Sequence, residues 1–404
     1  MLELIRNEIR LFFNKKNILL FITGIIAIVL LYQYHYVKAY KDYPQVRLME
    51  LQDNKKDIEI YAKAYQNRLE RLRKEYPGHP DTEEAELMSK VWNSYSSLTD
   101  SLMSYWNWPD RYQKDIQEAE IMLDEQLRPV SEMNVEVGDT NLYRSTQKDW
   151  NERMLLIQAY EKKGKVLPIA RDVPSGAYVL NDGLSGTSII FLIVALLVLF
   201  WNYDSWCTDF EQSTCRILFT LPYARKTLFL IRYLVRAVFS FGGVTLLFGE
   251  LYLCGKIRFG DGFDDFVIIN TKSFNGFTYF KTGWKELMGA DKAVPIEDTI
   301  FWKAVLILAF IATLIAFVHL ISFGLRNQIG TLIILVAIVV VIVTYVLYPK
   351  EHKDVGLNVF LYFQAGNALN GSLGIGLVPM LTLLGVSLVF IIGLTALWFE
   401  KREI

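Results

Sequence analysis

The sequence predicts an all-α polytopic membrane protein with six transmembrane helices, an N-terminal interfacial helix and a mostly helical extracellular domain. Three observations lead to this prediction. Hydrophobic residues make up 52% of the 404 residues, although 21% of the residues are charged. The apolar residues are concentrated in long blocks, and the charged residues fall largely between the blocks. Lys and Arg near the ends of the blocks favour one side of a membrane.

Six stretches have the length and apolar character of membrane spans. They cover residues 17–37, 187–203, 228–254, 300–325, 329–348 and 373–399. The first has no small-residue cleavage site after it, which indicates an uncleaved anchor and not a signal peptide. The expected organisation is an interfacial helix and first span over 1–37, an extracellular helical domain over 38–186, and five further spans over 187–404.

The segment before the first span predicts an amphipathic helix that lies on the cytoplasmic leaflet. Its apolar residues recur at helical spacing: Leu2, Ile5, Ile9, Phe12 and Phe13. Charged residues stand between them: Glu3, Arg6, Glu8 and Arg10. A frayed extension of the first span is the alternative, but it explains the recurring charge less well.

The basic residues near the span ends predict the orientation. They fall on one side if there are six spans: Arg6, Arg10, Lys15, Lys16, Arg216, Arg225, Lys226, Arg326, Lys401 and Arg402. Both termini are then cytoplasmic, and 38–186, 255–299 and 349–372 lie outside. The expected location is the cell membrane, as a multi-pass protein of a bacterial cytoplasmic membrane. Arg232 and Arg236, one turn apart in the third span, are expected to extend toward cytoplasmic headgroups.

The segment between the first two spans predicts a domain of packed helices. Apolar residues recur at three- and four-residue steps in 45–76, 82–106, 116–127 and 147–162, with breaks at 77–80 and at Pro109. An aromatic group precedes the second break: Tyr105, Trp106 and Trp108. Two interpretations stay open for this group. It packs the tip of a helical hairpin, or it contacts a substrate or the outer leaflet.

Motifs for several other classes of protein are missing from the sequence. There are three cysteines, Cys207, Cys215 and Cys254, at spacings that suit neither a disulfide framework nor a zinc site. No Gly-x-x-x-x-Gly-Lys-Ser/Thr loop or His-Glu-x-x-His motif occurs, and no basic face suggests nucleic acid. We therefore expect no catalytic residue, no metal and no cofactor in this chain, which is not an enzyme.

The segment between the second and third spans carries the most specific signal. Residues 208–222 predict a short helix that starts with acidic residues and ends near Pro222. Its apolar residues are expected to be exposed: Phe210, Ile217, Leu218 and Phe219. An exposed amphipathic helix beside the membrane needs a protein surface to dock on.

The order Glu211-x-x-Thr214-x-x-x-Leu218-x-x-x-Pro222-x-x-Arg225 resembles the loop after the second span of ABC-2 type transporter permeases. In that family this loop bears the coupling helix that docks into an ATPase subunit. The resemblance implies coupling roles for Phe210, Glu211, Thr214, Arg216, Leu218, Pro222 and Arg225. It also implies two partners, a second permease chain and an ATP-binding-cassette ATPase that holds ATP and Mg. The family often has Gly where Ser213 stands and Lys where Arg232 stands.

The resemblance implies the permease subunit of an exporter for an amphipathic substrate, such as an antimicrobial peptide, a lipid or a glycolipid. Monovalent cation efflux stays open within the same class. Glu250 and His319, ionisable residues inside spans, are candidate pathway residues. The alternative class is a membrane-anchored sensor or scaffold, in which the extracellular domain binds a ligand and the cytoplasmic loop recruits a signalling partner.

Overall fold

The computed structural model describes residues 2–79, 81–108, 113–118, 121–122, 125, 152–168, 173–214, 220, 223–271, 291–347, 362–370 and 375–401. The chain forms two compact units. Unit 1 comprises Met1–Tyr36 and Pro174–Ile404, and unit 2 comprises Val37–Val173. Residues 174–186 therefore belong to unit 1, although the sequence placed them in the extracellular domain. The reason is a short helix over Gly176–Gly183 that packs against the helices of unit 1.

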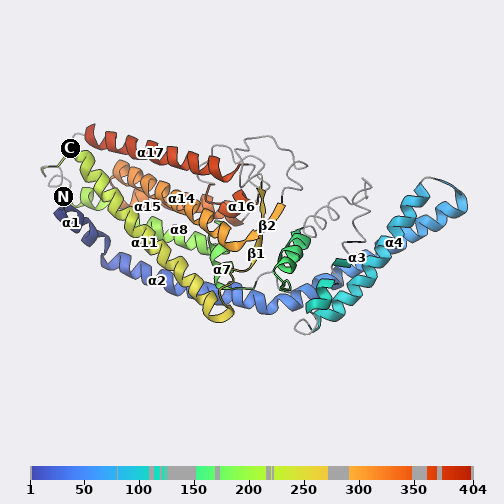
Figure 1. Ribbon diagram of the computed structural model, residues 1–404. Helices are drawn as coiled ribbons and strands as arrows, with labels where there is room; N and C mark the ends of the chain where they lie inside the picture. Colours follow the sequence, from blue (N-terminus) through green and yellow to red (C-terminus); the bar gives the residue numbers. More distant parts are fainter. Residues whose placement is uncertain are drawn as a thin grey trace. The chain divides into compact units, whose positions relative to one another are not determined.

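Unit 1 is a bundle of helices with one small β-hairpin (Figure 1). Its helices are Leu2–Phe12 (α1), Lys15–Leu31 (α2), Gly176–Gly183 (α7), Ile189–Asn202 (α8), Cys207–Glu211 (α9), Arg225–Phe259 (α11), Ile296–Leu325 (α14), Gln328–Leu347 (α15), Ala365–Leu369 (α16) and Leu377–Lys401 (α17). Strands Phe266–Asn270 (β1) and Asp291–Pro295 (β2) pair antiparallel. The mostly helical expectation is confirmed, and the hairpin is an addition to it.

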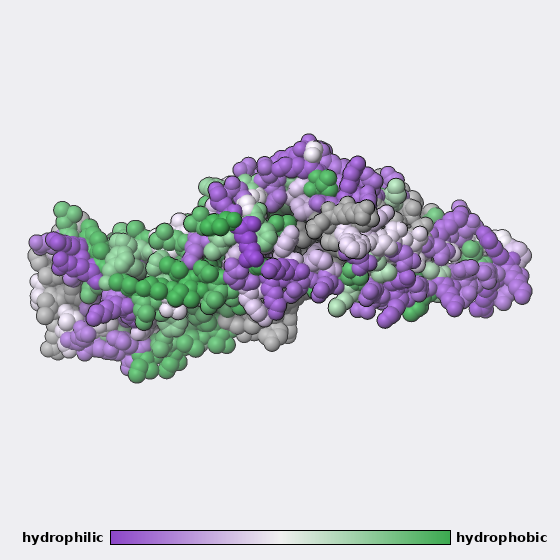
Figure 2. Space-filling model, turned by 90° about the horizontal axis from the view of Figure 1, so that it is seen from below, coloured by the Kyte–Doolittle hydropathy of each residue, from purple (hydrophilic) through white to green (hydrophobic). Residues whose placement is uncertain are grey.

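Five helical runs among the described residues are long and apolar enough to cross a membrane. They are Lys15–Val46, Ile189–Glu211, Arg225–Phe259, Ile296–Leu325 and Leu377–Lys401. The expected span over 329–348 corresponds to α15, of which Gln328–Val340 counts as a shorter apolar helix. A sixth span stays a prediction. Hydrophobic residues cover much of the visible surface of these helices (Figure 2).

Local capping explains where several of these helices begin. Asn14 ends the turn after α1, and its side-chain oxygen accepts a hydrogen bond from the Asn17 backbone N–H at 2.8 Å, which starts α2. Ser188 starts α8 in the same way through the N–H of Phe191, at 3.2 Å. Because α1 and α2 are separated by this cap, α1 is a helix in its own right, as the sequence predicts.

Two glycines allow close approaches inside unit 1. A Cβ on Gly24 would lie 2.6 Å from a methyl group of Leu197, so α2 and α8 pack closely at this point. Gly186 has φ +81°, and a Cβ there would lie 1.7 Å from the carbonyl oxygen of Phe363. The same junction is held by a hydrogen bond from the Gly366 N–H to the Ser185 carbonyl at 2.7 Å. The α7–α8 turn and α16 are therefore joined through their backbones.

Unit 2 contains a helical hairpin of Lys38–Glu75 (α3) and Asp81–Trp106 (α4). Tyr61 stacks on Trp92 with ring centroids 5.0 Å apart, and Ala85 and Met88 are buried in the same interface. Helix α3 follows α2 directly through a π-helical turn over Tyr32–Val37, so it begins before the residue 45 expected from sequence.

In the remaining described part of unit 2, the side chain of Gln117 joins two segments by hydrogen bonds. Residues 113–118 and 152–162 are helical. Gln117 accepts a hydrogen bond from the Leu167 N–H at 3.1 Å and donates one to Glu161 at 3.1 Å. Ile116 and Ile157 are buried, as the apolar spacing predicts. The expected helix over 116–127 lies largely outside the described residues.

Candidate functional site: a buried ionic cluster

One end of unit 1 brings together α1, α9, α11, α14 and α17, and we call it the Arg232 end. Its apolar core consists of Leu4, Trp206, Leu228, Phe229, Phe323, Ala396 and Phe399. The N-terminal helix and the end of α17 therefore both reach this core, and the two termini lie at the same end of unit 1 (Figure 1). Charged side chains are buried within this core, which makes it the candidate functional site.

Arg232 is the central charge of this end, with a side chain that is 2% exposed. Its Nε and Nη2 donate to the Glu8 carboxylate of α1 at 2.8–3.0 Å. Its Nη1 donates to the Asp209 carboxylate of α9 and to the Ser205 carbonyl, the latter at 2.9 Å. The guanidinium also lies over the Trp206 ring, 4.1 Å from the centroid. Arg232 thus ties three segments that are distant in the sequence.

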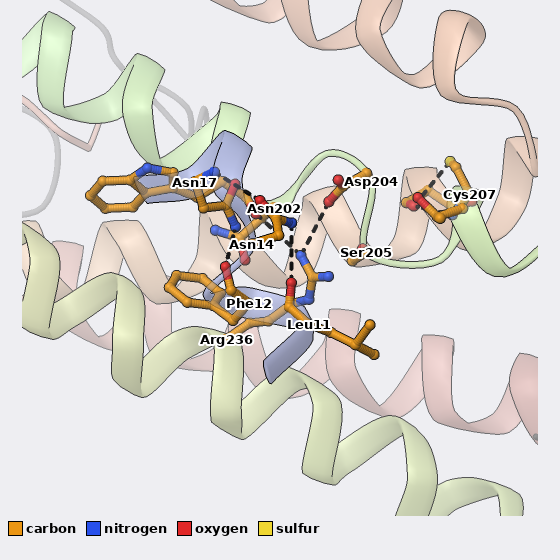
Figure 3. Close-up of polar contacts among 12 residues, drawn as sticks. Leu11, Phe12, Asn14, Asn17, Asn202, Asp204, Ser205, Cys207 and Arg236 are labelled. Atoms are coloured by element: carbon orange, nitrogen blue, oxygen red, sulfur yellow. Dashed lines mark hydrogen bonds and ion pairs between the residues drawn. The ribbon is translucent and has the colours of Figure 1, made fainter. Parts of the chain in front are cut away.

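A second ionic group lies one helical turn further along α11. Asp204 accepts hydrogen bonds from Lys16 at 2.6 Å and from Arg236 at 3.4 Å, and Arg236 also donates to the Trp201 carbonyl at 3.2 Å. Figure 3 shows Arg236 directed at Asp204, with Asn17 and Asn202 nearby. The expectation that Arg232 and Arg236 extend to headgroups is wrong. Both are buried because carboxylates from neighbouring segments neutralise them.

The two ionic groups together hold three carboxylates and three cations: Glu8, Asp204 and Asp209 with Lys16, Arg232 and Arg236. Buried charges need partners of opposite sign, since the desolvation of an unpaired charge costs several kcal/mol. Sequence analysis missed the three carboxylates as site residues. The sequence pattern that could have revealed them is an acidic residue next to a predicted span, combined with arginine inside another span.

A neutral hydrogen-bonded layer adjoins the ionic groups. The Trp206 indole N–H donates to His319 Nδ1 at 3.2 Å, and the Ser322 hydroxyl accepts from the backbone N–H groups of Trp206 and Cys207 at 3.0 and 3.2 Å. Cys207 Sγ lies 3.1 Å from the Thr331 hydroxyl. These bonds join the α8–α9 connection to α14 and α15.

His319, one of the two candidate pathway residues, is fully buried in this layer. Its ring packs against Trp206, Phe229 and Tyr233, and its Nε2 has no partner among the described residues. Glu250, the other candidate, lies half-buried on α11, and its Oε2 also has no partner there. The structure does not bring these two residues into one site.

The coupling segment begins in this cluster. Helix α9 ends at Glu211, because Ser213 takes a left-handed conformation with φ +59°. One continuous helix over 208–222 therefore does not form at its start. Thr214 turns back and donates to the Asp209 carboxylate at 3.0 Å. Arg216, Leu218 and Pro222 lie outside the described residues, while Arg225 begins α11.

Phe210 and Glu211 have partners within the chain. The Phe210 ring is partly buried against the core, 5.7 Å from Phe323, so it is not the exposed apolar residue that the sequence predicted. The Glu211 carboxylate accepts from the Gln328 backbone N–H at 2.8 Å and so satisfies the first turn of α15. Both residues join the start of the coupling segment to α14 and α15.

The aromatic group in unit 2 is divided. Tyr105 packs beside Leu102 and Ile116 in a small core, whereas Trp108 is 66% exposed. Trp106 ends α4, and its side chain lies outside the described residues. Tyr105 thus fits the hairpin-packing interpretation, and Trp108 has the exposure that a contact residue needs.

No protein-family model, no curated protein and no solved structure matches this chain. Within the described residues, no cluster of His, Cys, Asp and Glu could hold a metal ion. The coupling segment and the buried cluster beside it are therefore the features of this chain that bear on function.

Proposed function

We propose that this chain is the permease subunit of an ATP-driven exporter of the ABC-2 type. The observation that carries the proposal is the position of the motif that starts at Glu211. It follows directly on Trp206 and Asp209, which are bonded to α14 and α11. A segment that docks on a partner can drive transport when its movement also moves the membrane spans. The start of this segment is bonded to two of them, α11 and α14.

In the proposed mechanism, two copies of the chain form the pathway and two ATPase subunits bind below them. ATP and Mg belong to the ATPases, whose closure pushes on the segment around 208–222. Because separating Arg232 from Glu8 or Asp209 would leave a buried charge unpaired, α1, α9 and α11 move together. The ionic cluster thus acts as a rigid link between the docking segment and the bundle.

The proposed substrate is amphipathic, such as an antimicrobial peptide, a lipid or a glycolipid. Unit 2 is placed on the outer side, with both termini cytoplasmic, because Lys and Arg favour the opposite side. Exposed Trp108 is the contact residue that we propose in unit 2. Glu250 is the pathway residue with partial exposure on a span.

The decisive experiment is co-purification of the tagged chain from native membranes, followed by identification of bound chains that carry a Walker A motif. Leu218→Asp should strongly reduce recovery of the ATPase, since a charge would enter a desolvated interface. Val166→Asp is the matched control, because Val166 is an exposed apolar residue of unit 2. The amount of ATPase recovered with Val166→Asp should equal the amount recovered with wild type.

Glu211→Ala should affect assembly less and lower substrate-stimulated ATP hydrolysis. Its carboxylate is exposed and also bonded to α15, so part of the effect is transmitted through Gln328. Full recovery of the ATPase with Leu218→Asp, at equal expression, would make this loop a plain connector. The sensor interpretation would then replace the exporter.

A further inference from the structure

Helix α1 presents a protein-facing side that fixes its rotation. Leu4, Glu8 and Phe12, spaced by one turn, are 7%, 3% and 6% exposed. Glu8 is bound by Arg232, and Leu4 belongs to the core of the Arg232 end. Phe12 stacks on Phe239 of α11, with ring centroids 5.6 Å apart. The helix therefore cannot turn about its axis without breaking the ionic cluster.

The apolar residues that predicted an interfacial helix lie on a different side of α1. Leu2 is 83% exposed and Phe13, in the turn that follows, is 51% exposed, while Ile5 and Ile9 are half-buried at the flank. Large apolar residues exposed beside membrane spans are suited to hydrocarbon. The protein-facing side and the apolar side together leave one sector of the helix free.

That sector is basic. Arg6 and Arg10 are exposed and one turn apart, roughly opposite Glu8 on a helix of 3.6 residues per turn. Lys15 is exposed just beyond the end of α1. Among the described residues none of the three forms an ion pair, in contrast to the paired cations of the buried cluster. Glu3, seven residues before Arg10, is exposed on nearly the same side, so the two arginines leave this side with a net positive charge.

We propose that α1 binds the headgroups of anionic phospholipids through Arg6 and Arg10, with Leu2 and Phe13 in the acyl region. Adjacent apolar and unpaired basic sides match the two layers of an anionic leaflet. The exposed apolar residues Leu2 and Phe13 lie beside the arginines and close to the apolar run that begins at Lys15, which favours a lipid surface over a protein partner. This inference rests on the proposed membrane insertion and not on ATPase docking, so the co-purification experiment can fail without affecting it.

Anionic headgroups on α1 would also act on the buried cluster. Arg6, Glu8 and Arg10 belong to one helix of 11 residues, so a force on the basic side is carried to the Glu8–Arg232 pair. The content of anionic lipid in the leaflet would then regulate the helices that this pair joins. Headgroup binding is thus the second role of α1, beside its role as a packing element.

The test uses the purified full-length chain in phosphatidylcholine vesicles, with spin-labelled phosphatidylglycerol or phosphatidylcholine as the probe. Wild type should retain the anionic probe preferentially. Arg6→Gln/Arg10→Gln should reduce this preference by roughly threefold or more at low salt, since each basic residue near an anionic surface favours binding about fivefold. Raising the salt to about 1 M should remove the wild-type preference, because the Debye length falls to about 3 Å.

Two variants make the result specific. Lys56→Gln/Lys63→Gln removes the same charge from exposed positions of α3 in unit 2 and should leave the preference unchanged. Arg6→Lys/Arg10→Lys should retain it, because charge and not guanidinium geometry carries the binding. An unchanged preference in Arg6→Gln/Arg10→Gln would overturn the proposal. Equal loss in the unit 2 control would also overturn it, as would a wild type that does not discriminate between the probes.

Discussion

Unit 1 buries cations at two places, and their surroundings differ. At the Arg232 end, the guanidinium contacts two carboxylates, a carbonyl and an indole ring. At the second place, which we call the Lys303 end, the ammonium of Lys303 on α14 donates to the Asn181 carbonyl of α7 at 3.0 Å. No ion pair to Lys303 occurs among the described residues, although its side chain is buried.

The carboxylate of Asp182 acts on Lys303 through its charge but is hydrogen-bonded to another residue. Asp182 accepts a hydrogen bond from the Tyr36 hydroxyl at 2.5 Å, while Thr299 donates to the Asn181 side chain at 2.9 Å. The Lys303 end is thus held mainly by neutral hydrogen bonds. Because a buried cation is costly without a direct counter-charge, removal of a charge should have opposite consequences at the two ends.

The largest expected effect is at the Arg232 end. Glu8→Gln leaves Arg232 with Asp209 as its remaining carboxylate, so we expect a loss of about 3–5 kcal/mol in the free energy of unfolding. The thermal midpoint in detergent should fall by many degrees. Glu3→Gln is the control, because Glu3 lies exposed on the same helix, and it should change the midpoint little. A small loss for Glu8→Gln would remove the contrast between the ends.

Trp206→Phe should have the next largest effect. It keeps an aromatic face for the guanidinium but removes the indole N–H that donates to His319. We expect a loss of about 1–3 kcal/mol, because His319 Nδ1 becomes a buried acceptor without a donor. His319→Phe in the same background tests the cause, since it removes the unsatisfied acceptor and should restore part of the thermal midpoint. No recovery in the double variant would assign the loss to packing.

Ser213→Gly should stabilise the loop after α9 by about 1 kcal/mol. Ser213 has φ +59°, a conformation that costs a residue with a Cβ about 1–2 kcal/mol and glycine almost nothing. The thermal midpoint should therefore rise slightly, and Gln212→Gly, next to it at φ −85°, should not raise it.

Lys303→Met should change the free energy of unfolding by less than about 1 kcal/mol, or increase it. Methionine has a similar length and leaves no buried charge. The Asn181 carbonyl loses its donor, but leaving this neutral group unsatisfied costs less than burying an unpaired charge. The thermal midpoint, measured beside that of Glu8→Gln, checks the sign. A loss as large as that of Glu8→Gln would mean that Lys303 has an effective counter-charge, and the two ends would then be alike.

The sequence predicted what depends on local pattern. The apolar blocks predicted the five helical runs that are long and apolar enough to cross a membrane, and the spacing of Leu2, Ile5 and Ile9 predicted α1, because helical periodicity is read within a few residues. The pairing of Glu8 with Arg232 could not be predicted this way, since 224 residues separate the two. Likewise, the β1–β2 hairpin and the docking of α7 depend on contacts between distant segments.

The coupling segment shows the same limit on a smaller scale. Its acidic start and its proline predicted a helix near 208, and α9 forms there. The end of α9 at Glu211 depends on Ser213, and serine is not a residue that signals a left-handed conformation. The inward position of Phe210 depends on Phe323, more than 100 residues away, so its spacing within the loop could not reveal it.

The smallest expected effect concerns an exposed charge at the Lys303 end. Asp261 follows α11, and its carboxylate accepts from Tyr252 at 2.6 Å and from Lys256 at 2.8 Å. These hydrogen bonds lower the pKa of Asp261 below its ordinary value. A carboxyl whose pKa is lower in the folded protein favours folding above the pKa of the unfolded chain, about 3.9, and loses this contribution as pH falls through the folded value.

The difference in thermal midpoint between wild type and Asp261→Asn should therefore be constant from about pH 7 to pH 5 and shrink below about pH 4. The backbone carbonyl of Asp261, which accepts from the Ala177 N–H at 2.7 Å, is present in both proteins, so α7 stays docked and the comparison isolates the carboxylate. A difference in thermal midpoint that grows on acidification would contradict the expected pH dependence. A zero difference at neutral pH would show that this exposed ion pair does not contribute to stability.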